Sequence, residues 1–226
     1  MKKSKEFIIK KKYTVSVVFA VAFCGLIALV RAYNVAPIGP LGTEIGFYGL
    51  NGTVRDAISV NETWYEITEI LGYLSIAVAG FFVILGAVQM LKRKSLFKVD
   101  KKFYALAGLY AAMAFIYALF EVVVVNYRPV IMEGAEHVEA SFPSSHTMLV
   151  CVIMGGAFVI IGAYIKNRGL ALALKGLAVA VATVTVVGRL LSGVHWFTDI
   201  LGGVFISFAL VILFSAVCDK IDMKKE

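Results

Sequence analysis

Six long runs of apolar residues dominate the pattern of hydrophobic and polar positions, and polar stretches separate them. The runs lie near residues 13–32, 66–91, 103–125, 146–165, 171–188 and 196–218. A helix of roughly 20 apolar residues is long enough to cross the hydrocarbon core of a bilayer. The pattern therefore predicts an all-α, polytopic membrane protein with six transmembrane helices, formed by a single domain over residues 1–226.

The overall composition agrees with this prediction. Hydrophobic residues make up 60% of the chain and charged residues only 16%, whereas a soluble domain needs a larger polar fraction to cover its surface. The first apolar run follows several lysines, as a signal peptide would, but it is longer than a typical h-region and is followed by a poor cleavage site. We therefore expect an uncleaved first helix.

Positive charge is distributed unevenly along the chain. Eighteen of the 22 basic residues lie in four segments, namely the first twelve residues, residues 92–102, residues 166–175 and the C-terminal end. In a six-helix topology these segments share one side, which the positive-inside rule makes cytoplasmic. We expect both termini on the cytoplasmic side, and this distribution explains the net charge of +7 without a nucleic-acid partner.

The first outer connection, residues 33–65, contains the stretch TVRDAISV. Its residues Val54, Ala57 and Ile58 share one face if the stretch is helical. A short helix on the membrane surface is one interpretation and a plain loop is the other. The three cysteines all fall inside apolar runs, so we expect neither a disulfide framework nor a cysteine metal site.

A group of polar residues falls at the outer ends of the third to sixth predicted helices. Ionisable side chains at such a depth are costly unless they meet partners or water, so they are candidates for a functional site. The alternative is a set of ion pairs that ties helix ends together. The group consists of Arg128, Ser144, Ser145, His146, Arg189, His195 and Asp199.

The residue types in this group favour phosphoryl transfer. Arg128 and Arg189 can each bind phosphate oxygens through a bidentate guanidinium. Ser144 follows Pro143 and is a predicted N-cap, after which the free amides of the next helix form an anion site.

The histidines supply the remaining chemistry. Asp199 lies four residues after His195, so on a helix its carboxylate can accept the proton of one imidazole nitrogen and leave the other as a nucleophile. His146, on another helix, can protonate the leaving oxygen. We expect His137 to be a solvated loop side chain.

Three motifs resemble those of the type-2 phosphatidic acid phosphatase superfamily. They are RP at 128–129, PSSH at 143–146 and R-x5-H-x3-D at 189–199, within a core of residues 121–199. The resemblance implies that His195 attacks phosphorus to give a phosphohistidine, that Asp199 orients it and that His146 protonates the leaving group. It also implies phosphate binding by Arg128, Arg189, Ser144 and Ser145, with no metal and no other cofactor.

The chain departs from the family pattern at three positions. Ser145 replaces a glycine and Gly188 replaces a serine, and both changes are mild. Glu121 occupies the position of the family lysine, which places a carboxylate near the expected phosphate. It would then either pair with Arg128, seven residues on, or contact a hydroxyl or amine of the substrate headgroup.

These features predict a lipid phosphatase in the cell membrane whose site faces the outer side. Undecaprenyl pyrophosphate is the first choice of substrate, and phosphatidylglycerophosphate, phosphatidic acid and a lipid A phosphate are the alternatives. A protein of another class, one that binds or moves lipid with little catalysis, is the rival interpretation. The expected partners are the lipid phosphate and membrane lipids, and the sequence leaves the oligomeric state and the organism open.

Overall fold

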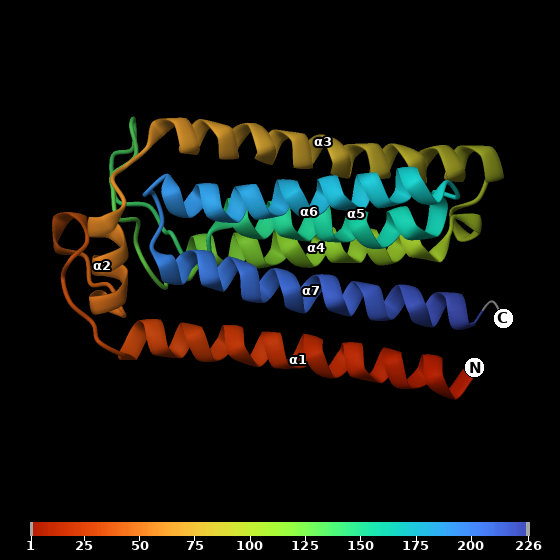
Figure 1. Cartoon of the computed structure of the whole chain (residues 1–226), viewed down its shortest axis with the longest axis horizontal. Helices are drawn as coiled ribbons and strands as arrows, with labels where there is room; N and C mark the ends of the chain where they lie inside the picture. Colours follow the sequence, from red (N-terminus) through yellow and green to blue (C-terminus); the bar gives the residue numbers. More distant parts are fainter. Residues whose placement is uncertain (1, 225–226) are drawn as a thin grey trace.

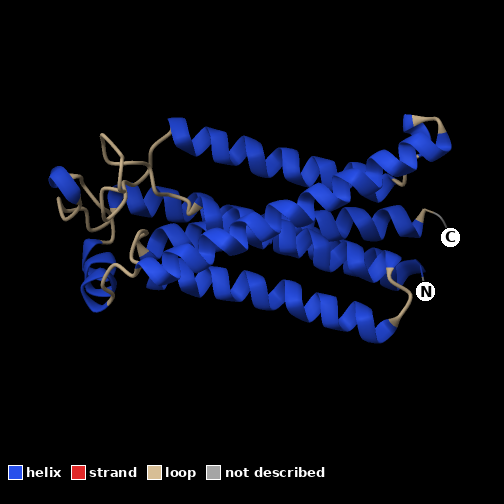
Figure 2. Cartoon of the chain, turned by 90° about the horizontal axis from the view of Figure 1, so that it is seen from above, coloured by secondary structure: helices blue, strands red, loops and turns tan. Residues whose placement is uncertain are grey.

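The structure is a computed structural model that describes residues 2–224, and within this range it contains helices and no strand (Figure 2). Six of its helices are long and apolar enough to cross a membrane, as the sequence predicted. These are α1 (Lys2–Ala32), α3 (Glu62–Arg93), α4 (Lys101–Val122), α5 (Ser145–Tyr164), α6 (Arg168–Leu191) and α7 (Phe197–Met223). The short helices are α2 (Tyr48–Ala57), η1 (Pro40–Gly42) and η2 (Leu96–Lys98).

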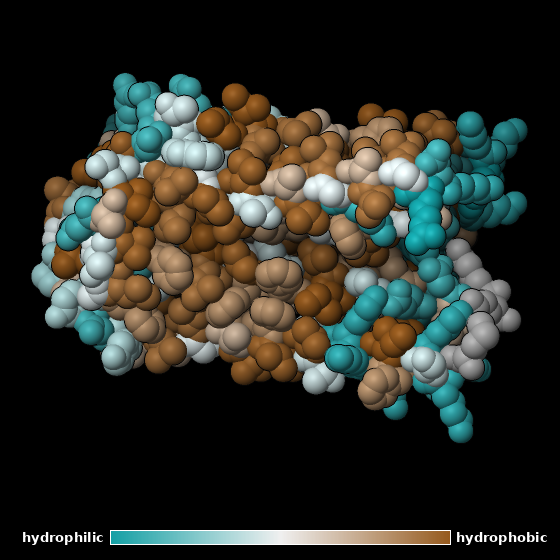
Figure 3. All heavy atoms as spheres, in the orientation of Figure 1, coloured by the Kyte–Doolittle hydropathy of each residue, from teal (hydrophilic) through white to brown (hydrophobic). Residues whose placement is uncertain are grey.

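The long helices run side by side, with both ends of the chain at one end of the bundle and α2 at the other (Figure 1). Helix α5 lies at the centre, because it contacts α3, α4, α6 and α7, whereas α1 packs mainly against α7. Apolar residues form a broad band around the middle of the face in Figure 3, and hydrophilic residues gather at the two ends. This distribution suits a protein whose middle contacts lipid.

Polar side chains determine where several of the helices begin. The side chains of Asn61, Asp100, Ser144 and Asn167 each accept a hydrogen bond from a backbone amide in the first turn that follows. Such N-caps satisfy amides that have no partner within the helix. The predicted N-cap at Ser144 is confirmed, and it fixes the start of α5 at the end of the bundle that carries α2.

Helix α2 decides between the two interpretations of the first long connection in favour of a short helix, although it ends at Ala57 and leaves Ile58 outside. It packs against α7 through Asn51, which is fully buried. The Asn51 side chain accepts from the Thr198 amide and donates to the Thr198 hydroxyl. Arg55 lies over the ring of Trp196, with 5.6 Å between its guanidinium carbon and the ring centroid. Helix α2 therefore braces the first turn of α7.

Two adjacent glycines let α7 approach α5 closely. A Cβ atom at Gly202 would lie 2.5 Å from the ring of Phe142, which is itself buried, and one at Gly203 would lie 2.9 Å from Thr147. The close approach brings the start of α5 next to the start of α7, where the Ser144 amide donates to the Asp199 carbonyl.

Gly202→Ala should therefore destabilise the protein by about 1–3 kcal/mol, because the added methyl group has no space beside Phe142. Gly176→Ala is the matched control, since nothing lies within 4 Å of a Cβ atom at that position in α6. We expect the control to be neutral or more stable, because alanine favours helix over glycine. Thermal unfolding in detergent measures both, and equal midpoints for the two variants would contradict this account of the helix contact.

Candidate active site

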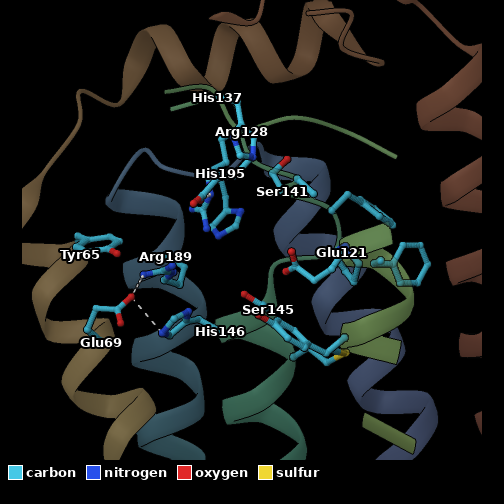
Figure 4. A pocket seen from close by; sticks show the side chains of 17 residues that line it. Tyr65, Glu69, Glu121, Arg128, His137, Ser141, Ser145, His146, Arg189 and His195 are labelled. Atoms are coloured by element: carbon cyan, nitrogen blue, oxygen red, sulfur yellow. Dashed lines mark hydrogen bonds and ion pairs between the residues drawn. The ribbon is translucent and has the colours of Figure 1, made fainter. Parts of the chain in front are cut away.

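A cavity of about 410 Å³ opens at the end of the bundle that carries α2 (Figure 4). Six of the eight predicted site residues line it, namely Glu121, Arg128, Ser145, His146, Arg189 and His195. The other two, Ser144 and Asp199, are fully buried and are not part of its lining. Residues from distant parts of the sequence thus meet at one cavity.

His195 lies on the turn between α6 and α7, two residues before α7 begins. The sequence interpretation placed it on a helix, and this is corrected. Gly193 allows the turn, because its φ of 71° is left-handed and a Cβ atom there would lie 3.1 Å from the Val60 backbone. The turn directs the imidazole of His195 into the protein, where its side chain is only 1% exposed.

Asp199 lies beside His195 as its spacing predicted, but the predicted hydrogen bond is absent. The His195 Nδ1 atom is 3.8 Å from Asp199 Oδ2, which is too long for a hydrogen bond. The carboxylate instead accepts from the Trp196 amide at 3.0 Å and from Asn126 Nδ2 at 3.2 Å. Backbone and side-chain donors therefore hold Asp199 at the start of α7.

The environment of His195 disfavours its protonated form. Burial lowers the pKa of His195 well below its usual value, and the positive charges of Arg128 and Arg189 lower it further. Neither imidazole nitrogen has a hydrogen bond of normal geometry to a described residue. A neutral imidazole with a free nitrogen is the form that a nucleophile requires.

Arg189 extends from the last turn of α6 and is 1% exposed. Its Nη1 atom donates to Thr68 Oγ1 at 3.2 Å and to Glu69 Oε1 at 3.1 Å. The guanidinium also lies over the Tyr65 ring, 5.0 Å from the centroid, whereas its buried Nε has no partner among the described residues. Helix α3 therefore holds this cation at the cavity, and the Nε donor stays without a partner among the described residues.

Arg128 comes from the connection between α4 and α5. Its Nε atom lies 2.9 Å from Glu139 Oε2, and its backbone amide donates to the Glu139 carbonyl. No ion pair joins it to Glu121 within the described residues, so the alternative in which those two residues pair is wrong. The Glu121 carboxylate, in the last turn of α4, interacts with the Tyr117 hydroxyl instead.

His146 lies in the first turn of α5 and points toward Glu69 (Figure 4). Its Nε2 atom is 3.1 Å from Glu69 Oε1, the oxygen that also contacts Arg189. Sequence reasoning missed Glu69 because it belongs to none of the three motifs. A signal was present, since a carboxylate within the apolar run 66–91 is costly unless it has a partner.

His137 is an exposed loop side chain, as expected, and it also lines the cavity (Figure 4). One further prediction needs correction. The Ser144 hydroxyl caps α5 and is fully buried, so its side chain does not face the cavity. Of the two predicted serines, Ser145 is the one that lines the cavity, beside the free amides at the start of α5.

The assembled site combines two guanidinium groups, the imidazoles of His146 and His195 and a helix N-terminus around one cavity. Such a set of donors binds an oxyanion with several oxygens, as a phosphate has. Among residues 2–224, no group of three or more His, Cys, Asp or Glu side chains is placed to hold a metal ion.

Fold and site together define a multi-pass membrane protein with a cavity lined by arginines and histidines at one end of its helical bundle. The family model of the PAP2 superfamily matches residues 109–222, and the chain belongs to this family. The family supports a phosphatase activity.

A solved structure described as the first transmembrane PAP2 type phosphatidylglycerolphosphate phosphatase from Bacillus subtilis is similar in fold. The TM-score is 0.63 at 19% sequence identity, and the match covers 93% of this chain and 97% of that one. A search of curated proteins gave no significant match.

The low pKa of His195 can be observed directly. We expect its imidazole to remain neutral at pH 6.5, near the pKa of a histidine in water, and to gain a proton only well below that pH, because burial penalises the charge. Nuclear magnetic resonance of protein labelled with ¹³C at its histidines measures this, and His195→Gln identifies the signal. A titration midpoint at or above pH 6.5 would contradict the prediction.

Proposed function

We propose that this protein is a lipid phosphatase that hydrolyses a lipid phosphate or pyrophosphate through a phosphohistidine intermediate on His195. The observation that carries the proposal is the buried imidazole of His195 at a cavity that it shares with Arg128, Arg189 and His146. These residues supply a nucleophile, two cations and a proton donor around one space.

The proposed reaction uses these residues as follows. Arg128, Arg189 and the amides at the start of α5 bind the phosphate oxygens, and a free nitrogen of His195 attacks phosphorus. The bond from phosphorus to the leaving oxygen breaks as the bond to nitrogen forms, and His146 gives that oxygen its proton. Asp199 stabilises the imidazolium that develops, and its distance to His195 shortens when the charge appears. Water then attacks phosphorus, His146 takes the water's proton, and His195 leaves.

A second groove supports a lipid as the substrate. It has a volume of about 410 Å³ and lies between α3 and α4, where it shares Glu69, Tyr117, Ser145, His146 and Met148 with the cavity. The rest of its lining is mainly apolar, with Tyr73 and Ile76 of α3 and Met113 and Ala114 of α4. Tyr73 and Ile76 are both exposed on the surface of the bundle. A lipid tail can lie in this groove while its phosphate reaches His195.

Undecaprenyl pyrophosphate is the substrate that we propose first, because an outward-facing phosphatase of this size suits the recycling of a carrier lipid. Phosphatidylglycerophosphate is the second candidate, and it is favoured by the similarity in fold to the phosphatidylglycerolphosphate phosphatase from Bacillus subtilis. Phosphatidic acid and a lipid A phosphate remain in the panel to be tested. Glu121 has no arginine partner among the described residues, so we propose that it contacts a hydroxyl or amine of the headgroup.

We further propose that both termini are cytoplasmic and that the active site faces the extracellular or periplasmic side. Most of the lysines and arginines lie in the N-terminal tail, in residues 92–102 and near the C-terminus. Both ends of the chain lie at the end of the bundle opposite α2 (Figure 1). The residues that line the cavity lie at the α2 end. The positive-inside rule assigns the lysine-rich end to the cytoplasm.

His195→Ala should reduce phosphate release to below about a hundredth of the wild-type rate, because the nucleophile is lost. Purified protein is assayed with the four lipid phosphates named above, and an unchanged thermal midpoint in detergent shows that the variant is folded. Gly176→Ala serves as a control that leaves the site intact. Substantial turnover by folded His195→Ala protein would refute the phosphohistidine mechanism.

The orientation has its own test. In a background without the three native cysteines, Glu136→Cys should react with a membrane-impermeant thiol reagent in intact cells, because its loop adjoins the cavity. Ser95→Cys, between α3 and α4 at the lysine-rich end, should react only after the cells are lysed. The reverse pattern would overturn the orientation.

A further inference from the structure

Glu69 has a position that the proposed reaction leaves unexplained. We propose, on the basis of the proposed function, that its carboxylate occupies the phosphate site when substrate is absent and that the substrate must displace it. Glu69 would then select ligands by their negative charge.

The first observation is that one oxygen atom makes both contacts. Glu69 Oε1 lies 3.1 Å from Arg189 Nη1 and 3.1 Å from His146 Nε2 (Figure 4). These are the groups that bind a phosphate oxygen and protonate the leaving oxygen in the proposed reaction. The substrate needs Arg189 for a phosphate oxygen and His146 for the leaving oxygen, so one carboxylate oxygen between them occupies both groups.

The second observation is the distribution of carboxylates around the arginines. Glu139 pairs with Arg128, and Glu69 pairs with Arg189, so each cation already has a protein anion beside it. A phosphate that binds beside Arg189 would face the negative charge of Glu69 at short range, where like charges repel strongly. Binding therefore requires the Glu69 carboxylate to move away.

The third observation is that the Glu69 side chain has space into which it can rotate. Its side chain is 24% exposed, and it lines both the cavity and the neighbouring groove between α3 and α4. A change of rotamer toward the groove would free Arg189 and His146 without movement of the backbone. The structure gives Asp199 no such freedom, because Asp199 is fully buried and held by Asn126 and the Trp196 amide.

This arrangement has a consequence for specificity in a membrane. Ordinary phospholipids are phosphodiesters with one negative charge on phosphorus, whereas phosphomonoesters and terminal pyrophosphates carry more. Only the more highly charged group competes well with a carboxylate for Arg189 and His146. Glu69 thereby reduces occupation of the site by the phosphodiester lipids that surround the protein.

The experiment measures anion binding without turnover, using the purified full chain in detergent. Orthovanadate, an inorganic mimic of phosphate, should bind about tenfold more tightly to Glu69→Gln than to wild type, because a competing charge is removed. Glu66→Gln is the matched control, since Glu66 lies one turn earlier on α3, is exposed and does not line the cavity. Isothermal titration calorimetry gives the three dissociation constants.

Two kinetic measurements accompany the binding data. The KM of Glu69→Gln for a short-chain lipid phosphomonoester should fall several-fold, and inhibition by phosphatidylglycerol, a phosphodiester, should become stronger than in wild type. Glu69→Asp is a second variant that keeps the charge but is too short to bridge Arg189 and His146. It should also bind orthovanadate more tightly, and it covers the case in which Glu69→Gln does not fold.

Unchanged or weaker orthovanadate binding in the folded variants would overturn the proposal. A large loss of kcat with unchanged KM would also overturn it, because Glu69 would then serve to orient His146. Absence of phosphate release by the wild-type protein would instead refute the proposed function, and the orthovanadate comparison would still decide the role of Glu69.

Discussion

The guanidinium of Arg189 is almost fully enclosed by protein at the cavity end of α6, and a buried cation of this kind is stable only with partners. Its partners Thr68 and Glu69 come from α3, and the ring of Tyr65 on the same helix lies beside it. The need to satisfy one charge therefore ties α3 to α6. Because Glu69 also contacts His146, the same interaction connects these two helices to the start of α5.

Close packing positions the other part of the site, namely the start of α7 and the turn that carries His195. Gly202 and Gly203 leave space for Phe142 and Thr147, and this brings the start of α5 against the start of α7. Helix α2 then covers the first turn of α7 through buried Asn51. His195 is therefore held on a short turn whose two ends are fixed, one by α6 and the other by the contacts around α7. The proposed nucleophile needs such support, because its buried imidazole has little polar contact of its own here.

The helices were predictable because lipid imposes a simple rule, namely that apolar runs of sufficient length become spans. The grouping of His146, Arg189 and His195 followed from the same topology, since each lies at the end of its apolar run that was predicted to face the outer side of the membrane. The partners of these residues could not be predicted in this way. Arg128 pairs with Glu139 rather than Glu121 because the connection between α4 and α5 folds back on itself, with a bridge between Tyr127 and Ala140. No periodicity in the sequence predicts the conformation of such a loop. For the same reason the sequence did not predict that His137 lines the cavity.

The site contains two histidine–carboxylate pairs that differ in how firmly the carboxylate is held. Asp199 has no exposed surface and accepts a backbone hydrogen bond, which holds it firmly next to His195. Glu69 is held only by side chains, at the border between a polar cavity and an apolar groove. In the proposed reaction, a firmly held carboxylate suits Asp199, which has to stabilise positive charge on His195. A partly exposed carboxylate suits the role proposed for Glu69, whose position an anionic substrate has to enter. The difference in burial follows from the positions of the two acids, one at the start of α7 and the other on the side of α3 that faces the cavity.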